Sequence, residues 1–410
     1  MTTYALFCVP GHGHVNPTLA LAQELVARGE RVIYYQTEEF RPAIEATGAV
    51  FRLYKSEAWK RHLPHLASTL TGKPNLVSRV GMMATLARES VREMPQLLEQ
   101  MVADHIDCVL YDRTFMQGIF ISQALHLPAV QLSPSFMVNE HAFKQLASQM
   151  TESDRPSLEW WATLNEELAR ECETYKLPRF TFQELMTHVE NLNIVFLPRA
   201  FQPGGETFDE RYVFVGPSVP ARRYYSGDFS LERLDKRPLL YISLGTAFNN
   251  QVDFYNMCFD AFAQSEWQVV LSFGTRIDPA TLKEPPANFI IAPHVPQLEV
   301  LSRADLFISH GGMNSTMESL WFGVPLVVVP QMIEQEMNAR RVQELGLGLA
   351  LDKETLTAEK LRAAVDQITH DPSFRARVQA MQQEIRQAGG YQRAADAIIH
   401  YTHGAQQAKV

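Results

Sequence analysis

Short apolar runs alternate with longer helix-forming stretches through most of this 410-residue chain. Each run is apolar at nearly every position and ends near a glycine, a proline or a polar cluster. Strands of this kind are buried on both faces, and their alternation with helices predicts parallel βαβ units. The expected strands are residues 4–9, 31–37, 50–54, 108–111 and 129–132, and then 239–243, 268–272, 289–292, 306–309 and 326–329. The pattern therefore predicts an α/β protein with two doubly wound sheets.

The length of the chain and a break in the alternation indicate two domains. A chain of 410 residues exceeds the usual size of a single hydrophobic core. The segment 216–238 is rich in proline, glycine and charge, so we expect it to be a linker. The expected domains are 1–215 and 239–385, and residues 386–410 form a final helix.

The charge balance favours a small-molecule partner over nucleic acid. The chain has 46 acidic and 37 basic residues, a formal net charge of −9, and no long lysine or arginine run. Its four cysteines have neither paired nor metal-type spacing, which fits a reducing compartment. The first residues lack the basic segment of a signal peptide, and no apolar run approaches the ~20 residues that cross a bilayer. We therefore expect a cytoplasmic protein without stable membrane insertion.

A strand, a glycine pair and a helix follow one another between residues 305 and 322, which is a typical phosphate-binding arrangement. Gly311 and Gly312 allow close approach to the backbone, and a helix start offers unpaired amides and a partial positive charge. Asn314 and Ser315 add donors, His310 can donate to a phosphate oxygen, and a carboxylate one turn later, Glu318, can accept from ribose hydroxyls. The alternative is that Asn314 and Ser315 only cap the helix and Glu318 only complements its dipole.

Two polar residues follow strands of the first half, where a doubly wound sheet opens its ligand crevice. His14 lies in the turn after the first strand, and Asp112 comes directly after the strand 108–111. An ordinary imidazole titrates near 6.5 and can accept a proton, and a carboxylate can hold its second nitrogen. His12 is the rival base, but its position between two glycines suggests an exposed side chain. We expect Asn16 to cap the following helix with Pro17 at its first position.

Gly11-x-Gly13-x-x-Asn16 also approaches the dinucleotide-binding fingerprint, so an NAD(P)-dependent oxidoreductase is an alternative. Asn16 occupies the third glycine position, which weakens this interpretation. The oxidoreductase interpretation also does not explain the second phosphate-binding pattern, from His310 to Glu318. A non-enzymatic nucleotide-sugar sensor is a third option, and the presence of both His14 and Asp112 speaks against it.

The block from His294 to Gln335 resembles the donor-binding signature of the UDP-glycosyltransferase superfamily, in its bacterial macrolide-glycosyltransferase branch. The stretch beginning at Gln297, the Gly11–Pro17 turn and the Ser243–Thr246 turn match the family in the same order, so the resemblance covers most of the chain. It implies the GT-B fold, in which two Rossmann-like domains face each other across a cleft. The N-terminal domain then holds the acceptor, the C-terminal domain holds the donor, and the final helix returns to the N-terminal domain.

The resemblance also implies roles for individual residues. The family's catalytic dyad maps onto His14, as general base, and Asp112. Glu334 and Gln335 map to contacts with the sugar hydroxyls, although the family more often has aspartate at the first position. The other expected UDP-sugar-binding residues are Gly13, Ser243, Thr246, Val295, Gln297, His310, Gly312, Asn314, Ser315 and Glu318. No Asp-x-Asp pair occurs in the chain, so we expect no metal site and no cofactor, with the UDP-sugar as co-substrate.

The function implied is inverting transfer of a hexose, most simply glucose from UDP-glucose, to a hydroxyl of a small hydrophobic acceptor. A macrolide, a polyketide, a flavonoid or another phenolic fits this description. Epimerisation or hydrolysis of a sugar nucleotide on the same fold remains an alternative. Methionine and aromatic residues suit an adaptable apolar acceptor pocket, and each of them is also compatible with an ordinary core. The candidates are Met82, Met83, Phe115, Met116, Phe136, Met137, Phe143, Trp160 and Trp161.

Overall fold

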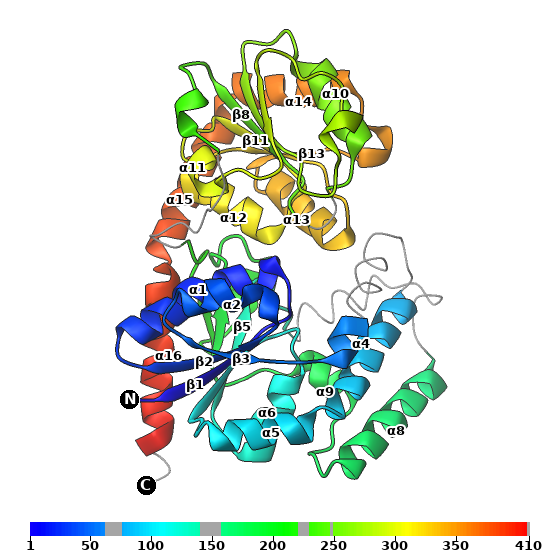
Figure 1. Cartoon of the computed structure of the whole chain (residues 1–410), viewed down its shortest axis with the longest axis vertical. Helices are drawn as coiled ribbons and strands as arrows, with labels where there is room; N and C mark the ends of the chain where they lie inside the picture. Colours follow the sequence, from blue (N-terminus) through cyan, green and yellow to red (C-terminus); the bar gives the residue numbers. More distant parts are fainter. Residues whose placement is uncertain (62–75, 140–156, 220–228, 247–248, 408–410) are drawn as a thin grey trace. The chain divides into compact units, whose positions relative to one another are not determined.

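The computed structural model describes residues 1–410 except 62–75, 140–156, 220–228, 247–248 and 408–410. The chain divides into two compact units, the first made of Met1–Ser218 and Gly389–Val410 and the second of Val219–Ala388. Each unit contains one sheet with helices on both of its faces (Figure 1). Phe143, one of the acceptor-pocket candidates, lies outside the described residues.

The first unit is built on a seven-stranded parallel sheet with the strand order β3-β2-β1-β4-β5-β6-β7. Its strands are β1 (Thr3–Phe7), β2 (Arg31–Gln36), β3 (Val50–Leu53), β4 (Cys108–Asp112), β5 (Ala129–Ser133), β6 (Asn193–Val195) and β7 (Tyr212–Phe214). Its helices are α1 (His12–Ala27), α2 (Arg41–Glu45), α4 (Leu76–Val91), α5 (Met94–Ala103), α6 (Gln117–Leu125), α8 (Leu158–Thr174), α9 (Phe182–Thr187) and α16 (Gly390–Gln407). Because alternate residues of β1 enter two different apolar clusters, this sheet is buried on both faces.

The second unit is built on a six-stranded parallel sheet with the order β10-β9-β8-β11-β12-β13. Its strands are β8 (Leu239–Ser243), β9 (Gln268–Ser272), β10 (Phe289–Ala292), β11 (Leu306–Ser309), β12 (Leu326–Val328) and β13 (Gly348–Ala350). Its helices are α10 (Val252–Phe262), α11 (Gln297–Leu301), α12 (Met313–Phe322), α13 (Ile333–Glu344), α14 (Ala358–His370) and α15 (Pro372–Gln387). Both sheets are doubly wound, and the strand order reverses between β1 and β4 in one and between β8 and β11 in the other.

The boundary segments pack as parts of the units. Residues 229–238, within the expected linker, belong to the second unit, where Gln268 bonds the backbone of Arg233 and Asp235. The final helix α16 lies along α1 in the first unit (Figure 1). Arg28 at the end of α1 pairs with Asp396 of α16 and donates to the Gln392 carbonyl at 3.3 Å.

Helix α1 begins earlier than the Asn16–Pro17 pattern predicts, so that prediction is wrong. The helix starts at His12 with Gly11 as its extended N-cap residue, and Pro17 lies inside it. The Gly11 carbonyl accepts from the amides of His14 and Val15 at 2.9 and 3.0 Å, which closes the first turn before Asn16 is reached. Pro17 is the sixth residue of the helix and contributes no amide to it. His14 therefore lies on the first turn of α1 instead of in a loop.

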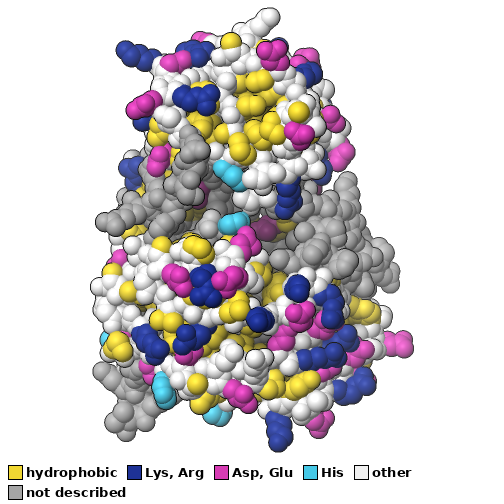
Figure 2. Space-filling view, in the orientation of Figure 1, with side chains coloured by type: hydrophobic (Ala, Val, Ile, Leu, Met, Phe, Trp, Pro, Cys, Tyr) yellow, Lys and Arg dark blue, Asp and Glu magenta, His cyan; other side chains and the backbone are white. Residues whose placement is uncertain are grey.

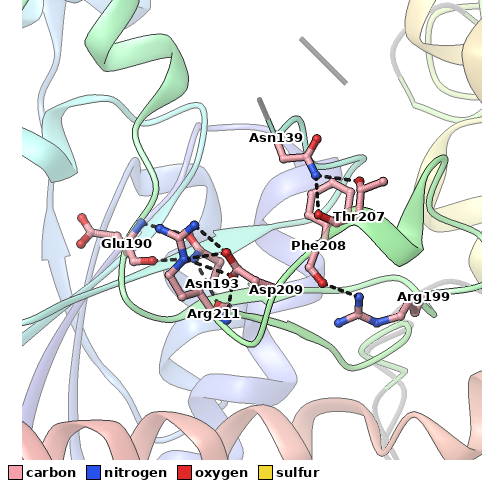
Figure 3. Close-up of polar contacts among 8 residues, drawn as sticks. All are labelled: Asn139, Glu190, Asn193, Arg199, Thr207, Phe208, Asp209 and Arg211. Carbon is pink, nitrogen blue, oxygen red and sulfur yellow. Dashed lines mark hydrogen bonds and ion pairs between the residues drawn. The ribbon is translucent and has the colours of Figure 1, made fainter. Parts of the chain in front are cut away.

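A single arginine organises the segment between β6 and β7 (Figure 3). Arg199 donates to the carbonyls of Gly205 and Phe208 at 2.7 and 2.9 Å, and its guanidinium lies 4.5 Å from the ring centre of Phe214. Asn139 donates to both the side chain and the carbonyl of Thr207. These contacts satisfy backbone carbonyls of the turn that precedes the short edge strand β7.

Candidate active site

His14 and Asp112 meet at the point where the strand order of the first sheet reverses. His14 follows β1 on the first turn of α1, and Asp112 is the last residue of the neighbouring strand β4. The His14 Nδ1 atom lies 2.7 Å from the Asp112 Oδ2 atom. The carboxyl ends of parallel strands beside such a reversal are where open α/β sheets bind ligands. The structure therefore brings the two expected dyad residues together at the edge of the sheet where such folds bind ligands.

The Asp112 carboxylate is buried, and both of its oxygen atoms make hydrogen bonds. The side chain of Asp112 is 1% exposed and that of His14 is 30% exposed. The second carboxylate oxygen accepts from the Thr114 amide at 2.8 Å and from the Thr114 hydroxyl. Burial by itself would raise the pKa of Asp112, but the charge of His14 and the hydrogen bonds from His14 and Thr114 outweigh it and lower that pKa below its ordinary value. Asp112 thus stays ionised, and Nε2 is the ring nitrogen of His14 that can take a proton from a substrate.

His12 has a different environment, as its position between two glycines predicts. Its side chain is 50% exposed, its Nε2 lies 3.5 Å from Glu39, and its ring packs edge-on against Phe40. No buried carboxylate holds His12 among the contacts described. Gly13, between the two histidines, has no atom within 4 Å of the position where a Cβ would lie.

In the second unit, the turn between β11 and α12 leads into a helix whose N-cap residue has no side chain. Gly312 is the N-cap residue of α12, and it makes no side-chain cap hydrogen bond. Asn314 and Ser315 therefore do not act as its N-cap. Gly311 has φ +80°, and a Cβ there would lie 2.5 Å from Val328, so both the backbone and the packing require glycine. An uncapped ten-residue helix beside a strand-order reversal is a favourable place for phosphate.

His310 is held as a neutral imidazole between two glycines. A Cβ on Gly245 or on Gly312 would lie 2.5 or 2.4 Å from its ring. Burial lowers the pKa of His310 to about 4, although a hydrogen bond with the Ser243 backbone opposes the shift. A neutral imidazole has one donor and one acceptor nitrogen, so His310 can form a hydrogen bond with a ligand atom at this edge.

Gln297, Ser315 and Glu318 form one hydrogen-bonded group. The Gln297 Nε2 atom donates to Glu318 Oε2 at 2.6 Å and to Ser315 Oγ at 3.2 Å. Burial raises the pKa of Glu318 to about 7, and the hydrogen bond from Gln297 opposes that shift. Sequence reasoning missed Tyr241, whose hydroxyl donates to Gln297 Oε1 at 3.0 Å. Only the position of this residue two places before Ser243 in β8 could have suggested it.

The remaining expected donor residues differ in their surroundings. The Ser243 hydroxyl accepts from the Gly245 amide at 3.2 Å, and Thr246 is exposed in the following turn. Val295 is buried, and Glu334 is exposed on the first turn of α13. The side chain of Gln335 is buried, and its Oε1 atom accepts a hydrogen bond from the Gln331 amide at 2.8 Å. The carboxamide oxygen of Gln335 thus stabilises the turn before α13.

The acceptor-pocket candidates do not form one group. Phe115 and Met116 are buried in an apolar cluster against which Met83 and Trp161 pack. Phe136 stacks instead on Phe201, with ring centres 5.7 Å apart. Met137 is buried beside Gln202, Trp160 packs against Trp161 and Gly81, and Met82 is half-buried on α4.

Charged side chains of both signs are interspersed on the face shown in Figure 2. Two ion pairs link neighbouring helices: Arg88 of α4 pairs with Glu167 of α8, and Arg92, just after α4, pairs with Glu171 of α8. No helix within the described ranges is long and apolar enough to cross a membrane. Among the same residues, no group of three or more His, Cys, Asp and Glu side chains is placed to hold a metal ion.

Comparisons with known proteins agree on one kind of relative. Residues 256–400 match the family model described as erythromycin biosynthesis protein CIII-like, C-terminal domain. The chain is 44% identical to the NDP-glycosyltransferase YjiC of Bacillus licheniformis over 395 residues, covering 96% of each protein. It is 32% identical to the oleandomycin glycosyltransferase of Streptomyces antibioticus, covering 96% of this chain and 89% of that one. The crystal structure of CalG4, the calicheamicin glycosyltransferase, superposes with a TM-score of 0.82 at 34% identity and covers 98% of both chains.

Proposed function

Because this chain belongs to the UDP-glycosyltransferase superfamily, in its bacterial macrolide-glycosyltransferase branch, we propose that it transfers a hexose from a UDP-sugar to a hydroxyl of a small apolar acceptor. The family and the GT-B fold with two Rossmann-like domains, both expected from the sequence, are confirmed. Family membership makes the protein a glycosyltransferase that uses a sugar-nucleotide donor. The proposal adds the donor, the acceptor class, the stereochemistry and the residue roles.

The contact between His14 and Asp112 is the observation that carries the proposal. With Nδ1 of His14 held at 2.7 Å by a buried carboxylate, Nε2 accepts the proton of the acceptor hydroxyl as its oxygen attacks the anomeric carbon. The carboxylate of Asp112 then stabilises the imidazolium that forms. One attack on the face opposite the leaving UDP inverts the anomeric centre, so an α-linked UDP-glucose would give a β-glucoside.

The second unit supplies the groups that a departing UDP requires. The uncapped start of α12 and the neutral imidazole of His310 offer hydrogen bonds to the diphosphate. These donors are already fixed by the fold, so they meet the growing charge without reorganisation. Gln297, Ser315 and Glu318 lie beside them and suit the ribose hydroxyls. Val295, Ser243 and Thr246 complete the proposed donor contacts of this unit, and Gly13 of the first unit is a further proposed contact. The exposed Glu334 is better placed to contact the sugar than Gln335, whose oxygen already accepts from the Gln331 amide.

Helix amides and imidazole provide the electrostatic stabilisation that a divalent cation provides in other glycosyltransferases. We therefore include metal independence in the proposal, with no cofactor beyond the co-substrate. The named relatives act in natural-product chemistry, as the oleandomycin and calicheamicin enzymes show by their names. This supports an apolar hydroxylated acceptor such as a macrolide, polyketide, flavonoid or other phenolic, and it gives no support to the oxidoreductase alternative.

Mass spectrometry tests the proposal directly. The protein is incubated with UDP-glucose and a panel of macrolides and flavonoids, and acceptor products are searched for one added hexose. We expect a β-glycoside, whose configuration the anomeric NMR coupling reports. Release of free glucose from every mixture without a glycoside would identify a hydrolase instead. Conversion of UDP-glucose to another UDP-hexose would identify an epimerase.

A further inference from the structure

Tyr241 lies behind the group formed by Gln297, Ser315 and Glu318. It is the third residue of β8, is 1% exposed, and stacks on Phe307 of β11 with ring centres 4.6 Å apart. Its hydroxyl donates to Gln297 Oε1 at 3.0 Å. β8 and β11 flank the reversal of strand order, and Tyr241 lies two residues before the carboxyl end of β8, the end at which the second sheet opens to ligands.

The hydroxyl of Tyr241 determines which way the Gln297 amide points. A carboxamide has an acceptor end and a donor end that are nearly identical in shape. With the oxygen held by Tyr241, the Nε2 atom faces Glu318 at 2.6 Å and Ser315 at 3.2 Å. The reverse orientation would turn the amide oxygen toward the Glu318 carboxylate, which only accepts, so the hydrogen bond with Glu318 would be lost. The Tyr241 hydroxyl would also lose the oxygen to which it donates.

We propose that Tyr241 is a positioning residue for donor binding, which fixes the Gln297 amide so that Gln297 and Glu318 together hold the ribose of the nucleotide sugar. This inference rests on the proposed function, since it assigns the ribose to these two side chains. Tyr241 itself does not touch the nucleotide in this account. It acts through the amide.

The titratable groups in this cluster are few, which makes its behaviour measurable. Among the described residues, Gln297 donates a hydrogen bond to Glu318, and Tyr241 is a titratable group that interacts electrostatically with Glu318. Burial raises the pKa of Tyr241 far above its ordinary value, so this hydroxyl keeps its proton at any pH used for binding. A change in the titration of Glu318 therefore reports the orientation of the Gln297 amide.

The test compares Tyr241→Phe with Tyr255→Phe in the full-length protein. Tyr255 is a neighbouring buried tyrosine whose hydroxyl has no hydrogen-bond partner among the described residues, so removing that hydroxyl is a matched control for packing. UDP-glucose affinity is measured by calorimetry. The titration of Glu318 is followed by NMR in the ligand-free protein labelled with ¹³C-glutamate, and Glu318→Gln assigns the resonance.

For Tyr241→Phe we expect UDP-glucose binding about fivefold weaker, as the loss of one hydrogen bond implies, and a higher titration midpoint for Glu318. Tyr255→Phe should leave both unchanged, and Tyr241→Phe should add nothing once Gln297 is replaced by alanine. Wild-type affinity together with an unmoved midpoint in Tyr241→Phe overturns the inference, as do equal effects in both tyrosine variants. If the wild-type protein binds no UDP-glucose, the proposed function fails. The ligand-free titration still decides then whether Tyr241 orients the amide.

Discussion

Donor binding should depend on pH through Glu318. Burial raises the pKa of this carboxyl to about 7, and only the ionised form accepts hydrogen bonds from two ribose hydroxyls. With that midpoint, roughly nine-tenths of the groups are ionised at pH 8 and roughly one-tenth at pH 6. UDP-glucose affinity should therefore rise about tenfold from pH 6 to pH 8, which corresponds to ~1.4 kcal/mol.

UDP-glucose is the suitable ligand for this measurement, because its phosphates have no ionisation near neutral pH whereas the terminal phosphate of UDP does. Calorimetry at half-unit steps gives the profile for the wild-type protein and for Glu318→Gln. The glutamine variant should bind more weakly at pH 8 and show a flat profile. A wild-type profile that is flat, or one that keeps its slope in Glu318→Gln, would refute the assignment of this step to Glu318.

The stability of the fold should change with pH in the opposite direction to donor affinity: it should fall as the pH rises and Glu318 ionises. Because folding raises the pKa of Glu318 from its ordinary 4.5 to about 7, its contribution to stability is present below the lower value and is lost as the pH rises through 7. The loss is on the order of 3 kcal/mol. Glu318→Gln should therefore gain stability relative to the wild type between pH 5 and pH 8 in urea unfolding. A constant difference across that range would contradict the buried-carboxyl explanation.

Three further perturbations have defined outcomes. Gly312→Ala places a Cβ 2.4 Å from His310 Nε2, so UDP affinity should fall by about tenfold or more. As a control, Gly404→Ala should bind UDP normally, because no atom lies within 4 Å of the added Cβ. Arg199→Ala removes the hydrogen bonds to two turn carbonyls and should lower the free energy of unfolding by about 2 kcal/mol. Arg211→Ala breaks an exposed ion pair and should lower it by less than ~1 kcal/mol. Equal losses in the two variants would contradict the role of Arg199. Treatment with EDTA should leave the transfer rate unchanged, and a large loss restored by a divalent cation would disprove metal independence.

The sequence predicts the long elements of the fold because their patterns are complete within each segment. The strands at 239–243, 268–272, 289–292 and 306–309 match the structure to the residue, since each is a continuous apolar run with clear ends. The strands β6, β7 and β13, of three residues each, were not among the strands expected from the sequence. Their pairing depends on tertiary contacts such as those of Arg199, which joins carbonyls that are 6 and 9 residues away.

The site shows the same division between local pattern and tertiary contact. His14 and Asp112, 98 residues apart, could be paired in advance because both follow strands whose carboxyl ends share one edge of a sheet. Tyr241 and Gln297 could not, because a tyrosine in an apolar strand looks like core until α11 brings an amide to its hydroxyl. The resemblance assigns Gln335 to the sugar hydroxyls, and the bond of its Oε1 atom with the Gln331 amide is visible only in the folded turn.

The most direct test of the account compares transfer by His14→Ala and His12→Ala under identical conditions. The two histidines are two residues apart on the first turn of α1, but only His14 is held by the buried carboxylate of Asp112. The account predicts that His14→Ala loses about 10² to 10⁴-fold in turnover while it keeps wild-type affinity for UDP, and that His12→Ala stays close to the wild type. Full turnover in His14→Ala, or equal losses in both variants, would contradict it.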